Sequence, residues 1–379
     1  MLDISLIVLS AGESSRFKAK TKKQWLRSGN NPLWLNITNS LASCYAFKDV
    51  IVAGSAEELA YMYKFCDYKI IKGGTTRQNS LANALQYIQS EYVLVSDAAR
   101  CTVPGSLTLR LLEEAKSADI IVPYLPVTDT VTYENNTINR DKVKLIQTPQ
   151  LSKTQVLKAA LSKESEFTDE SSAINAYGGS VKYILGDIRA EKLTLVHSKN
   201  NPLSLLSPPA SAVFTGIGFD AHAYEEGKTM YLGGVKIEDN YGFKAHSDGD
   251  ALIHALIDAL LGAAGAGDIG EWFPDTDMKY KDMDSTKLLE SIVLFLTRVG
   301  FEIVHCDITV IAQKPKISPF KQAMSKKLAH ILGISPIHIN IKATTTENMG
   351  FTGREEGIAV QAAATLRYYD WTTDENINC

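Results

Sequence analysis

The chain has 379 residues, of which 45% are hydrophobic and 22% charged, and a formal net charge of −4. This composition is typical of a globular protein with about two domains, and the small net charge argues against a nucleic-acid or membrane surface as the main partner. The five cysteines are odd in number and form no CxxC pair. They therefore argue against a disulfide framework or a cysteine-ligated zinc and indicate a cytoplasmic protein.

The first half of the chain, to about residue 197, alternates short β-rich runs with helical patterns. Its first apolar run, from Ile4, is too short for a bilayer span and is predicted to be a strand instead of a signal peptide. The expected strands are Ile4–Leu9, Val50–Ala53, Tyr68–Ile71, Tyr92–Val95 and Ile120–Val122. The expected helices lie near Leu33–Cys44, Ala56–Phe65, Arg77–Gln89 and Ser106–Ala115. This alternation predicts an open, mostly parallel, Rossmann-like α/β sheet with ligands at the carboxyl ends of its strands.

Small and basic residues follow the first strand. The loop from Ser10 to Phe17 contains Gly12 and Arg16, and Lys22 and Lys23 come shortly after it. Small residues let the backbone approach a phosphate chain closely, and the cations can neutralise that chain. A second glycine-rich turn, at residues 73–80, opens a helix, and Asp97 stands at a strand's carboxyl end, where it is well placed to bind Mg²⁺. Together these features predict a nucleotide site, although such a loop alone is often only a solvated turn.

Residues 198–211 change character, because Asn and Pro flank a short apolar patch. We interpret this stretch as a linker, which divides the chain into domains 1–211 and 212–379. The second domain carries another α/β pattern. Its expected strands are Val213–His222, Glu302–Ala312, Ile337–Lys342 and Ile358–Leu366, and its expected helices are Asp248–Ala264, Ser285–Val299 and Phe320–Leu332.

The segment from Phe219 to His254 is the predicted metal site of the second domain. Asp220 and His222 are two apart on an expected strand, so their side chains share a face. Ser247 and Asp250 have the spacing of a capping box, and a helix that begins there presents His254 one turn further on. If His246 is included, the segment offers one Asp and two or three His. Such a set can make a metal site with an open coordination position. Separate core or surface histidines are the alternative.

Further along, residues 273–277 form a turn-rich acidic loop, and three consecutive threonines, 344–346, precede Glu347. A threonine run is often just a strand edge. Here Lys342, Glu347 and Arg354 surround it, so we expect it to bind phosphate oxygens and a second hard cation, Mg²⁺ or Mn²⁺.

The first half resembles the 2-C-methyl-D-erythritol 4-phosphate cytidylyltransferases over residues 1–200. The resemblance rests on Ala11-Gly12, Arg16, Lys23-Gln24, Gly73-Gly74, Arg77, Ser80, Asp97-Ala98-Ala99-Arg100, Thr148-Pro149-Gln150 and Thr168-Asp169-Glu170. It implies transfer of CMP from CTP, with Mg²⁺ or Mn²⁺, to methylerythritol phosphate. The chain departs from the commoner loop at Glu13-Ser14-Ser15 and at Lys22, which stands where a proline is usual. The resemblance therefore does not determine the conformation of this loop.

The resemblance also implies roles for individual residues. Arg16 and Lys23 would bind the triphosphate, Arg140 and Lys192 the methylerythritol phosphate, Asp97 would lie near the metal, and Ser80 would contact the nucleoside. The further substrate contacts carried over from the motifs are Ala11, Gly12, Gly74, Arg77, Arg100, Thr168 and Asp169.

The second half, residues 213–367, resembles the 2-C-methyl-D-erythritol 2,4-cyclodiphosphate synthases. The match rests on Asp220-x-His222, residues 246–250 with His254, residues 273–277 and Ala343–Glu347. It implies cyclisation of CDP-methylerythritol 2-phosphate with loss of CMP, and a trimer with active sites between subunits. Asp220, His222 and His254 would bind Zn²⁺ (or Mn²⁺ or Co²⁺), Glu347 a second divalent ion, and His246 and Thr345 would position the substrate. The other implied substrate contacts are Ser247, Asp268, Gly270, Phe273, Asp277, Ala312, Pro315, Lys316, Thr344, Thr346, Phe351 and Arg354.

Together the two resemblances predict a bifunctional enzyme of the non-mevalonate isoprenoid pathway that assembles as a trimer or hexamer. A kinase acts between the two steps, and the chain contains no kinase-like loop, so that kinase is expected to be a separate protein; its docking on this chain is a hypothesis. The alternatives are a sugar-nucleotide transferase fused to a zinc phosphohydrolase, which would release inorganic phosphate, and a nucleotide-sensing scaffold, which would bind CTP without releasing pyrophosphate.

Overall fold

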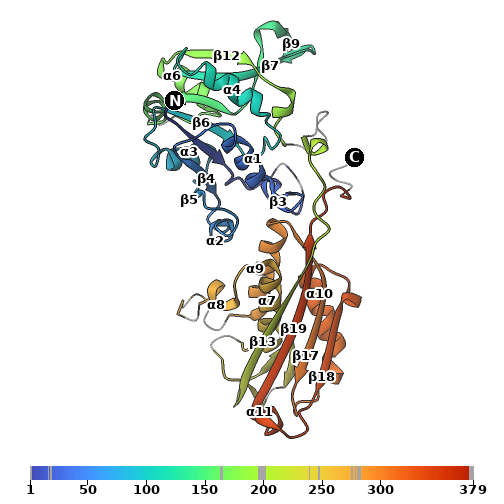
Figure 1. Ribbon diagram of the computed structural model, residues 1–379. Coiled ribbons are helices and arrows are strands. Elements are labelled where there is room, and N and C mark those ends of the chain that lie inside the picture. The colour runs from blue at the N-terminus through green and yellow to red at the C-terminus, as the bar shows by residue number, and fades with distance from the viewer. Residues whose placement is uncertain are drawn as a thin grey trace. The chain divides into compact units, whose positions relative to one another are not determined.

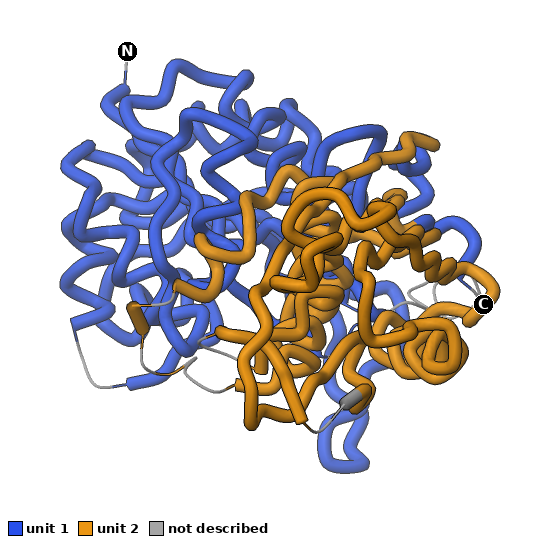
Figure 2. Tube along the Cα trace, turned by 90° about the horizontal axis from the view of Figure 1, so that it is seen from below, with its two compact units in different colours: residues 1–210, 370–379 blue, residues 211–369 orange. Residues whose placement is uncertain are grey.

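The structure is a computed structural model. It describes residues 2–374 except 16, 18, 163–164, 195–201, 239, 246–247, 275, 278 and 280–282. The chain forms two compact units (Figure 2), of which unit 1 is Met1–Ala210 with Asp370–Cys379 and unit 2 is Ser211–Tyr369. The sequence predicted domains 1–211 and 212–379. The structure differs at the C-terminal end, because residues 370–379 belong to unit 1. Among the described residues, no helix is long and apolar enough to cross a membrane.

Unit 1 is built on an eight-stranded sheet (Figure 1), with β12 (Val181–Leu185) paired to β7 beside the main path. Along that path the strands are β10 (Lys144–Ile146), β7 (Ile120–Pro126), β11 (Gln150–Lys153), β6 (Tyr92–Asp97), β1 (Ile4–Leu9), β4 (Val50–Gly54) and β5 (Lys69–Lys72). The strands β6, β1, β4 and β5 pair in parallel. Every residue of β1 and β6 and all but the first of β4 are buried, as is typical of strands covered on both faces, whereas the edge strand β5 is exposed at both of its ends. The prediction of a mostly parallel α/β sheet is confirmed.

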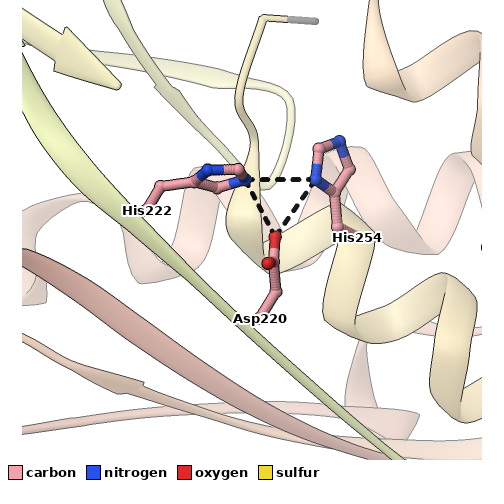
Figure 3. Close-up of side chains that lie close together, drawn as sticks. All are labelled: Asp220, His222 and His254. Carbon is pink, nitrogen blue, oxygen red and sulfur yellow. Dashed lines mark hydrogen bonds and ion pairs between the residues drawn. The ribbon is translucent and has the colours of Figure 1, made fainter. Parts of the chain in front are cut away.

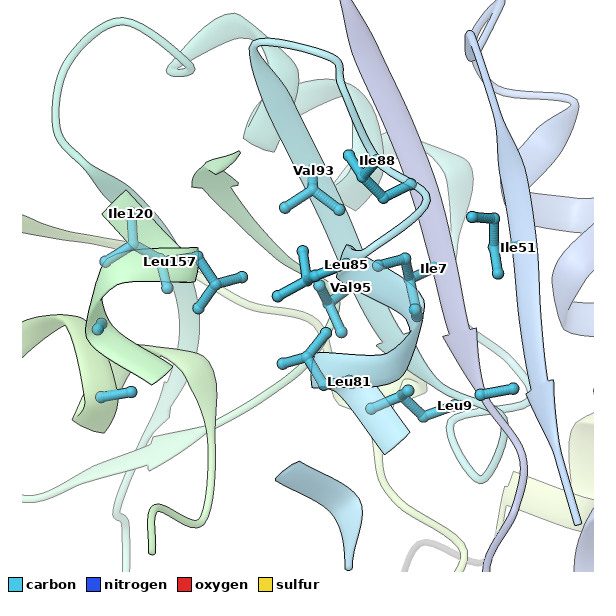
Figure 4. Close-up of a cluster of buried hydrophobic side chains, with 14 of the residues drawn as sticks. Ile7, Leu9, Ile51, Leu81, Leu85, Ile88, Val93, Val95, Ile120 and Leu157 are labelled. Atoms are coloured by element: carbon cyan, nitrogen blue, oxygen red, sulfur yellow. The ribbon is translucent and has the colours of Figure 1, made fainter. Parts of the chain in front are cut away.

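Helices pack on this sheet through apolar residues spaced three and four apart. In α3 (Arg77–Leu85), Leu81 and Leu85 point toward Ile7 and Val95 of the sheet (Figure 4). The other helices of unit 1 are α1 (Leu33–Ala42), α2 (Leu59–Met62), α4 (Gly105–Glu113), α5 (Thr154–Leu161) and α6 (Glu170–Tyr177). The helix expected at Ala56–Phe65 is reduced to the four residues of α2, because residues 55–58 turn before it begins.

Unit 2 is a second layered α/β structure. Its five-stranded sheet has the order β16 (Tyr241–Phe243), β13 (Val213–Glu226), β19 (Gly357–Tyr368), β17 (Phe301–Ile311) and β18 (Ile339–Thr344). Helices α7 (Ala251–Ala264), α9 (Ser285–Arg298) and α10 (Lys321–Leu332) cover one face (Figure 1). Strand β13 is antiparallel to β19, and β19 to β17, while β17 and β18 are parallel. The strands β13, β17 and β18 therefore end at the same edge.

Two glycines on β13 set the distance between this sheet and α7. A Cβ atom on Gly218 would clash with the carbonyl oxygen of Ala255, and one on Gly216 with the backbone at Ala259 and Ala263. The helix can lie against the bare strand backbone only because both positions lack a side chain. This close contact fixes where α7 holds His254 relative to the residues of β13.

Candidate functional sites

A cavity of about 760 Å³ opens where β1 and β6 end in unit 1. It lies at the carboxyl edge of the parallel strands, where ligands of open α/β sheets bind. Eight residues predicted from the sequence line it together: Ala11, Gly12, Lys23, Gly74, Arg77, Ser80, Asp97 and Lys192. Lining residues such as Gln24, Ser55 and Lys72 were not predicted as contacts.

The loop after β1 is held by Gln24. The amide nitrogen of Gln24 donates to the carbonyl oxygens of Ser10 (3.1 Å) and Gly12 (2.8 Å), while its oxygen accepts from the Ser14 hydroxyl (2.9 Å). The backbone N–H of Lys23 donates to that same hydroxyl at 3.1 Å. Ser14 adopts a left-handed conformation, with φ of 56°. Ser14, one of the residues at which the chain departs from the commoner loop, is therefore tied directly to the Lys23 segment.

A charged network forms one wall of the cavity. The Asp97 carboxylate pairs with Arg77 at 2.8 Å through one oxygen and with Lys192 at 2.6 Å through the other. Burial alone would raise the pKa of Asp97, but the charges of Arg77 and Lys192 lower the pKa of this carboxyl well below its usual range. Arg77 also pairs at 2.7 Å with Glu170, whose side chain is 0% exposed. This network keeps Asp97 ionised and fixes two cations at the cavity.

Other predicted contacts of unit 1 lie away from this lining. Arg100 is buried and donates to the carbonyl oxygens of Ala190 and Ile146. Asp169 caps the start of α6 by accepting from the N–H of Ser172 at 3.1 Å, and its neighbour Thr168 is exposed. Arg140 lies just after the hairpin of β8 (Val131–Tyr133) and β9 (Asn136–Ile138), where it donates to the carbonyl oxygen of Thr128. Arg16 lies outside the described residues.

In unit 2, Asp220 and His222 from β13 meet His254 from α7 (Figure 3). One oxygen of Asp220 is 3.0 Å from Nε2 of His222 and 3.1 Å from Nδ1 of His254, and the two nitrogens are 3.3 Å apart. Among the described residues, this trio is the one group of at least three His, Cys, Asp or Glu side chains able to share a metal ion. The two-residue spacing on the strand and the first turn of the helix bring the three donors together as predicted.

The remaining nitrogen of His254 is fixed by a relay of hydrogen bonds. Its Nε2 lies 2.9 Å from the Ser285 hydroxyl, and that hydroxyl donates to Asp248 at 2.5 Å. The N–H of Ser285 also donates to Asp248, at 3.1 Å. An imidazole whose far nitrogen is held in this way presents its Nδ1 to the trio in one orientation, which is the usual support of a metal-binding histidine.

The electrostatics of the trio suit a cation. Burial opposes ionisation of Asp220, but hydrogen bonds from His222 and His254 lower the pKa of its carboxyl below the usual range. Burial would lower the pKa of His254, and Asp220 overcomes that effect and raises it. One carboxylate and two imidazoles within 4.8 Å of one another are also a donor set that zinc and related transition metals accept. The residues present therefore fit a bound metal.

Asp250 has a different task from the trio. It is buried and forms the N-cap of α7, accepting from the N–H groups of Gly233, Gly234 and Ile253 at 2.7–3.1 Å. Helix α7 begins at Ala251, so the start expected at Asp248 is three residues early. His246 and Ser247 lie outside the described residues.

A second group of predicted residues lies around the ends of β17 and β18. Thr344 ends β18, the Thr345 hydroxyl donates to Glu347 at 2.8 Å, and the Thr346 hydroxyl lies 2.9 Å from that of Thr352. Glu347 has a positive φ of 50°, which turns the chain sharply after the threonines. Ala312, Pro315 and Lys316 follow β17, and the N–H of Ala312 donates to Thr344. Phe351 is exposed, and Arg354 pairs with Glu356 at 2.8 Å.

Four more predicted contacts lie after α7. Asp268 caps α8 (Ile269–Trp272), which contains Gly270, and accepts from the N–H of Glu271 at 3.0 Å. Phe273 follows that helix, and Asp277 accepts from the N–H of Lys279 at 3.0 Å.

The trio and the threonine group are separated within one chain. Both lie at the same edge of the sheet, but β19 and β17 stand between β13 and β18. At about 4.8 Å per strand, that separation is roughly 14 Å. Unit 2 therefore carries two separate groups of predicted site residues.

Comparison with known proteins agrees with this division. The model of the 2-C-methyl-D-erythritol 4-phosphate cytidylyltransferase family (IspD) matches residues 4–198, and that of the YgbB family matches residues 213–367. The bifunctional enzyme IspD/IspF of Aliarcobacter butzleri is 58% identical over 98% of this chain and 99% of its own, and that of Campylobacter fetus is 55% identical over the same shares. The chain belongs to the bifunctional IspD/IspF family.

A solved structure extends the similarity to the whole fold. The bifunctional IspDF from Campylobacter jejuni matches with a TM-score of 0.88 and 49% identity, over 98% of this chain and 100% of that chain. The IspD domain transfers CMP from CTP to 2-C-methyl-D-erythritol 4-phosphate and releases pyrophosphate, and the IspF domain cyclises CDP-methylerythritol 2-phosphate and releases CMP. IspF is a metal-dependent family, and the trio is its candidate metal site here.

Three residues that support the two IspD/IspF sites were not among the predicted site residues. Glu170 pairs with Arg77 from 93 positions away, and Ser285 and Asp248 are 37 apart. Glu170 follows the capping residue Asp169 in the motif Thr168-Asp169-Glu170, and this motif is a sequence signal from which its role could have been predicted. No spacing rule links Ser285 to His254.

Proposed function

We propose that the cavity of unit 1 binds CTP with its triphosphate against Lys23 and the loop after β1, with Arg16 as a second phosphate ligand and Ser80 at the nucleoside. The observation that carries this assignment is the convergence of Lys23, Arg77 and Lys192 with small loop residues on one cavity. Cations and backbone amides at one place are suited to neutralise a triphosphate. Mg²⁺ or Mn²⁺ would bind with the CTP, close to Asp97.

In this proposal, a phosphate oxygen of methylerythritol phosphate attacks the α-phosphorus of CTP and pyrophosphate leaves in line. No side-chain nucleophile is needed, so the protein contributes positioning and charge neutralisation. Lys192 would hold the phosphate of methylerythritol phosphate, and Arg140 would join it from outside the cavity lining. Replacing Lys192 with Ala is expected to raise KM for methylerythritol phosphate more than KM for CTP. An equal rise in both would contradict this division of roles.

In unit 2 we propose that Asp220, His222 and His254 bind Zn²⁺, with Mn²⁺ or Co²⁺ as substitutes, and that Glu347 binds Mg²⁺ or Mn²⁺ with the substrate diphosphate. A bound transition metal would supply Lewis acidity at a phosphate oxygen. The chain's own contribution is orientation: Ser285 fixes His254, and Thr345 and His246 would position the phosphate that attacks. Ala312, Pro315 and Lys316 would hold the cytidine.

Metal analysis tests the trio directly. Purified wild-type protein should contain one transition metal per chain, whereas the variant His222→Ala should contain almost none. His330→Ala, which alters an exposed histidine on α10, is the matched control and should keep the metal. Full metal content in His222→Ala would contradict the assignment.

We further propose that a cyclisation site is completed by a second copy of the chain, within a trimer or a hexamer. Two observations support this. The trio and the threonine group have two strands between them, β19 and β17. In addition, the face of β13 opposite α7 presents Val213, Ile217 and Phe219, each 59–67% exposed. Apolar side chains gathered on an open sheet face are typical of an interface. Mass determination in solution should give a multiple of three chains.

We also place the enzyme in the cytoplasm, where the thiols of its cysteines would stay reduced. Docking of the intervening kinase remains a hypothesis. Equal flux from the two halves supplied as separate chains would contradict a benefit of coupling.

A further inference from the structure

A short hairpin follows the Lys23 segment in unit 1. It consists of β2 (Arg27–Ser28) and β3 (Asn31–Pro32), joined through Gly29. The end of the linker lies along this hairpin: Gly29 donates its N–H to Pro208 at 3.0 Å, and Ala210 donates to Gly29 at 2.9 Å. The hairpin is thus held from one side by residues that lie about 180 positions later in the chain.

The C-terminal segment holds the same hairpin through Trp371. Its indole N–H donates to the carbonyl oxygen of Arg27 at 2.7 Å, a contact between residues 344 positions apart. The side chain is only 5% exposed. Asp370 orients it by accepting from the N–H of Thr372 at 3.0 Å and the Thr372 hydroxyl at 2.6 Å, which closes a tight turn.

Arg27 connects this contact to the cavity. Its buried guanidinium lies 5.8 Å from the ring centre of Trp25 and 5.2 Å from that of Phe65. The indole of Trp25 donates to Glu58 at 2.7 Å, and Glu58 also pairs at 2.8 Å with buried Lys22. The residues on both sides of Lys23 and Gln24 are therefore fixed to the core, which leaves Lys23 little freedom to change its position relative to the loop after β1.

We infer that Trp371 is a positioning residue for cytidylyl transfer, although it follows the last strand of the IspF domain in sequence. By holding the carbonyl of Arg27 it fixes the path of residues 22–28, and with it the place of Lys23 at the triphosphate. The inference rests on the proposed role of Lys23. It implies that the IspD site depends on residues supplied after the IspF domain.

The test compares Trp371→Phe, which keeps an aromatic ring but loses the donor, with Trp371→Ala in the full-length protein. Losing one buried hydrogen bond should raise KM for CTP about threefold to tenfold in Trp371→Phe, and more in Trp371→Ala. KM for methylerythritol phosphate and the cyclisation rate should not change. Tyr45→Phe is the matched control, because it removes an aromatic donor to the carbonyl of Leu2 (2.7 Å) elsewhere in unit 1. It should lower the melting temperature without changing KM for CTP.

An unchanged KM for CTP in Trp371→Phe overturns the inference, as does an equal rise in Tyr45→Phe, which would indicate general destabilisation. Should Trp371→Ala not fold, Trp371→Phe decides alone. Lys23→Ala, measured in parallel, separates the two claims. If Lys23→Ala retains full activity, the proposed role of Lys23 fails; if it is inactive while Trp371→Phe behaves as wild type, only the inference fails.

Discussion

The two sites of this enzyme handle charge in opposite ways. In unit 1, Asp97 is paired with Arg77 and Lys192, and Lys23 is a further cation in the cavity lining. In unit 2, Asp220 is held by two imidazoles, which are neutral when they bind a metal, so its charge is available to a metal ion. In the roles proposed above, the IspD cavity would neutralise phosphates with side chains that the chain carries, whereas the IspF trio would do so through a bound metal.

The sites also differ in how much of each a single chain supplies. The cavity of unit 1 is lined by residues of that one unit. The trio and the threonine group of unit 2 are separated by β19 and β17. In unit 1, only Arg140 of the residues proposed to hold both substrates lies outside the lining among the described residues that we discuss, whereas in unit 2 the two groups lie apart, and we expect cyclisation to need a neighbouring chain.

The largest expected effect is that of His254→Ala. As His254 is a proposed metal ligand, its loss should reduce CMP release from the cyclisation substrate on the order of a thousandfold, because the stabilisation of phosphoryl charge by a metal is worth several kcal/mol. Pyrophosphate release from CTP should be unchanged. Both rates are measured on one preparation, and loss of both would contradict independent sites.

Lys23→Ala should do the reverse. Removing a cation that stabilises the transferring phosphoryl group should slow pyrophosphate release about a hundredfold, while cyclisation continues at the wild-type rate. Lys48→Ala is the control, because Lys48 is exposed and pairs only weakly with Asp3 at 3.4 Å. A wild-type rate in Lys23→Ala would remove Lys23 from the triphosphate site.

A smaller effect is expected from Ser285→Ala, which leaves the three ligands in place and removes the hydroxyl that orients His254. Metal affinity should fall about tenfold to a hundredfold, as is usual when such a support is lost, and competition with a chelator measures it. Ser291→Ala on the same helix loses only a local bond to Leu288 and should bind metal normally. Equal affinities in the two variants would show that Ser285 does not tune the site.

The smallest effect concerns the packing that positions His254. Gly218→Ala should destabilise unit 2 by about 1 to 3 kcal/mol, because the added methyl clashes with α7. Gly262→Ala, on the facing surface of α7, meets only ordinary contacts at 3.8 Å or more and should be neutral or stabilising. Thermal unfolding distinguishes them, and similar melting temperatures would contradict the close contact.

The features that were predicted correctly from the sequence are those that depend on residues close together in the chain. Two-residue spacing put Asp220 beside His222, and small residues after a strand marked the loop at Gly12. What was missed depends on pairing across long separations. Strand β11 enters the parallel sheet antiparallel, between β6 and β7, and its Gln and Ser residues give no strand signal.

Long-range polar partners were missed for the same reason. The hydrogen bond of Trp371 to Arg27 and the ion pair of Glu170 with Arg77 depend on the complete fold. The capping box at Ser247 was predicted from local spacing alone. In the structure Asp250 is the N-cap of α7, and it also accepts hydrogen bonds from the N–H groups of Gly233 and Gly234, which local spacing does not reveal.

Complementation between two inactive variants tests most directly whether neighbouring chains share the cyclisation site. His254→Ala disables the trio, and Glu347→Gln disables the threonine group. Each should be inactive in cyclisation alone. When the two are co-expressed in equal amounts, random assembly should restore about a quarter of the wild-type sites, since each site draws one half from each of two chains. Cyclisation at about a quarter of the wild-type rate is the predicted result, and a rate no higher than the sum of the separate variants would contradict a shared site.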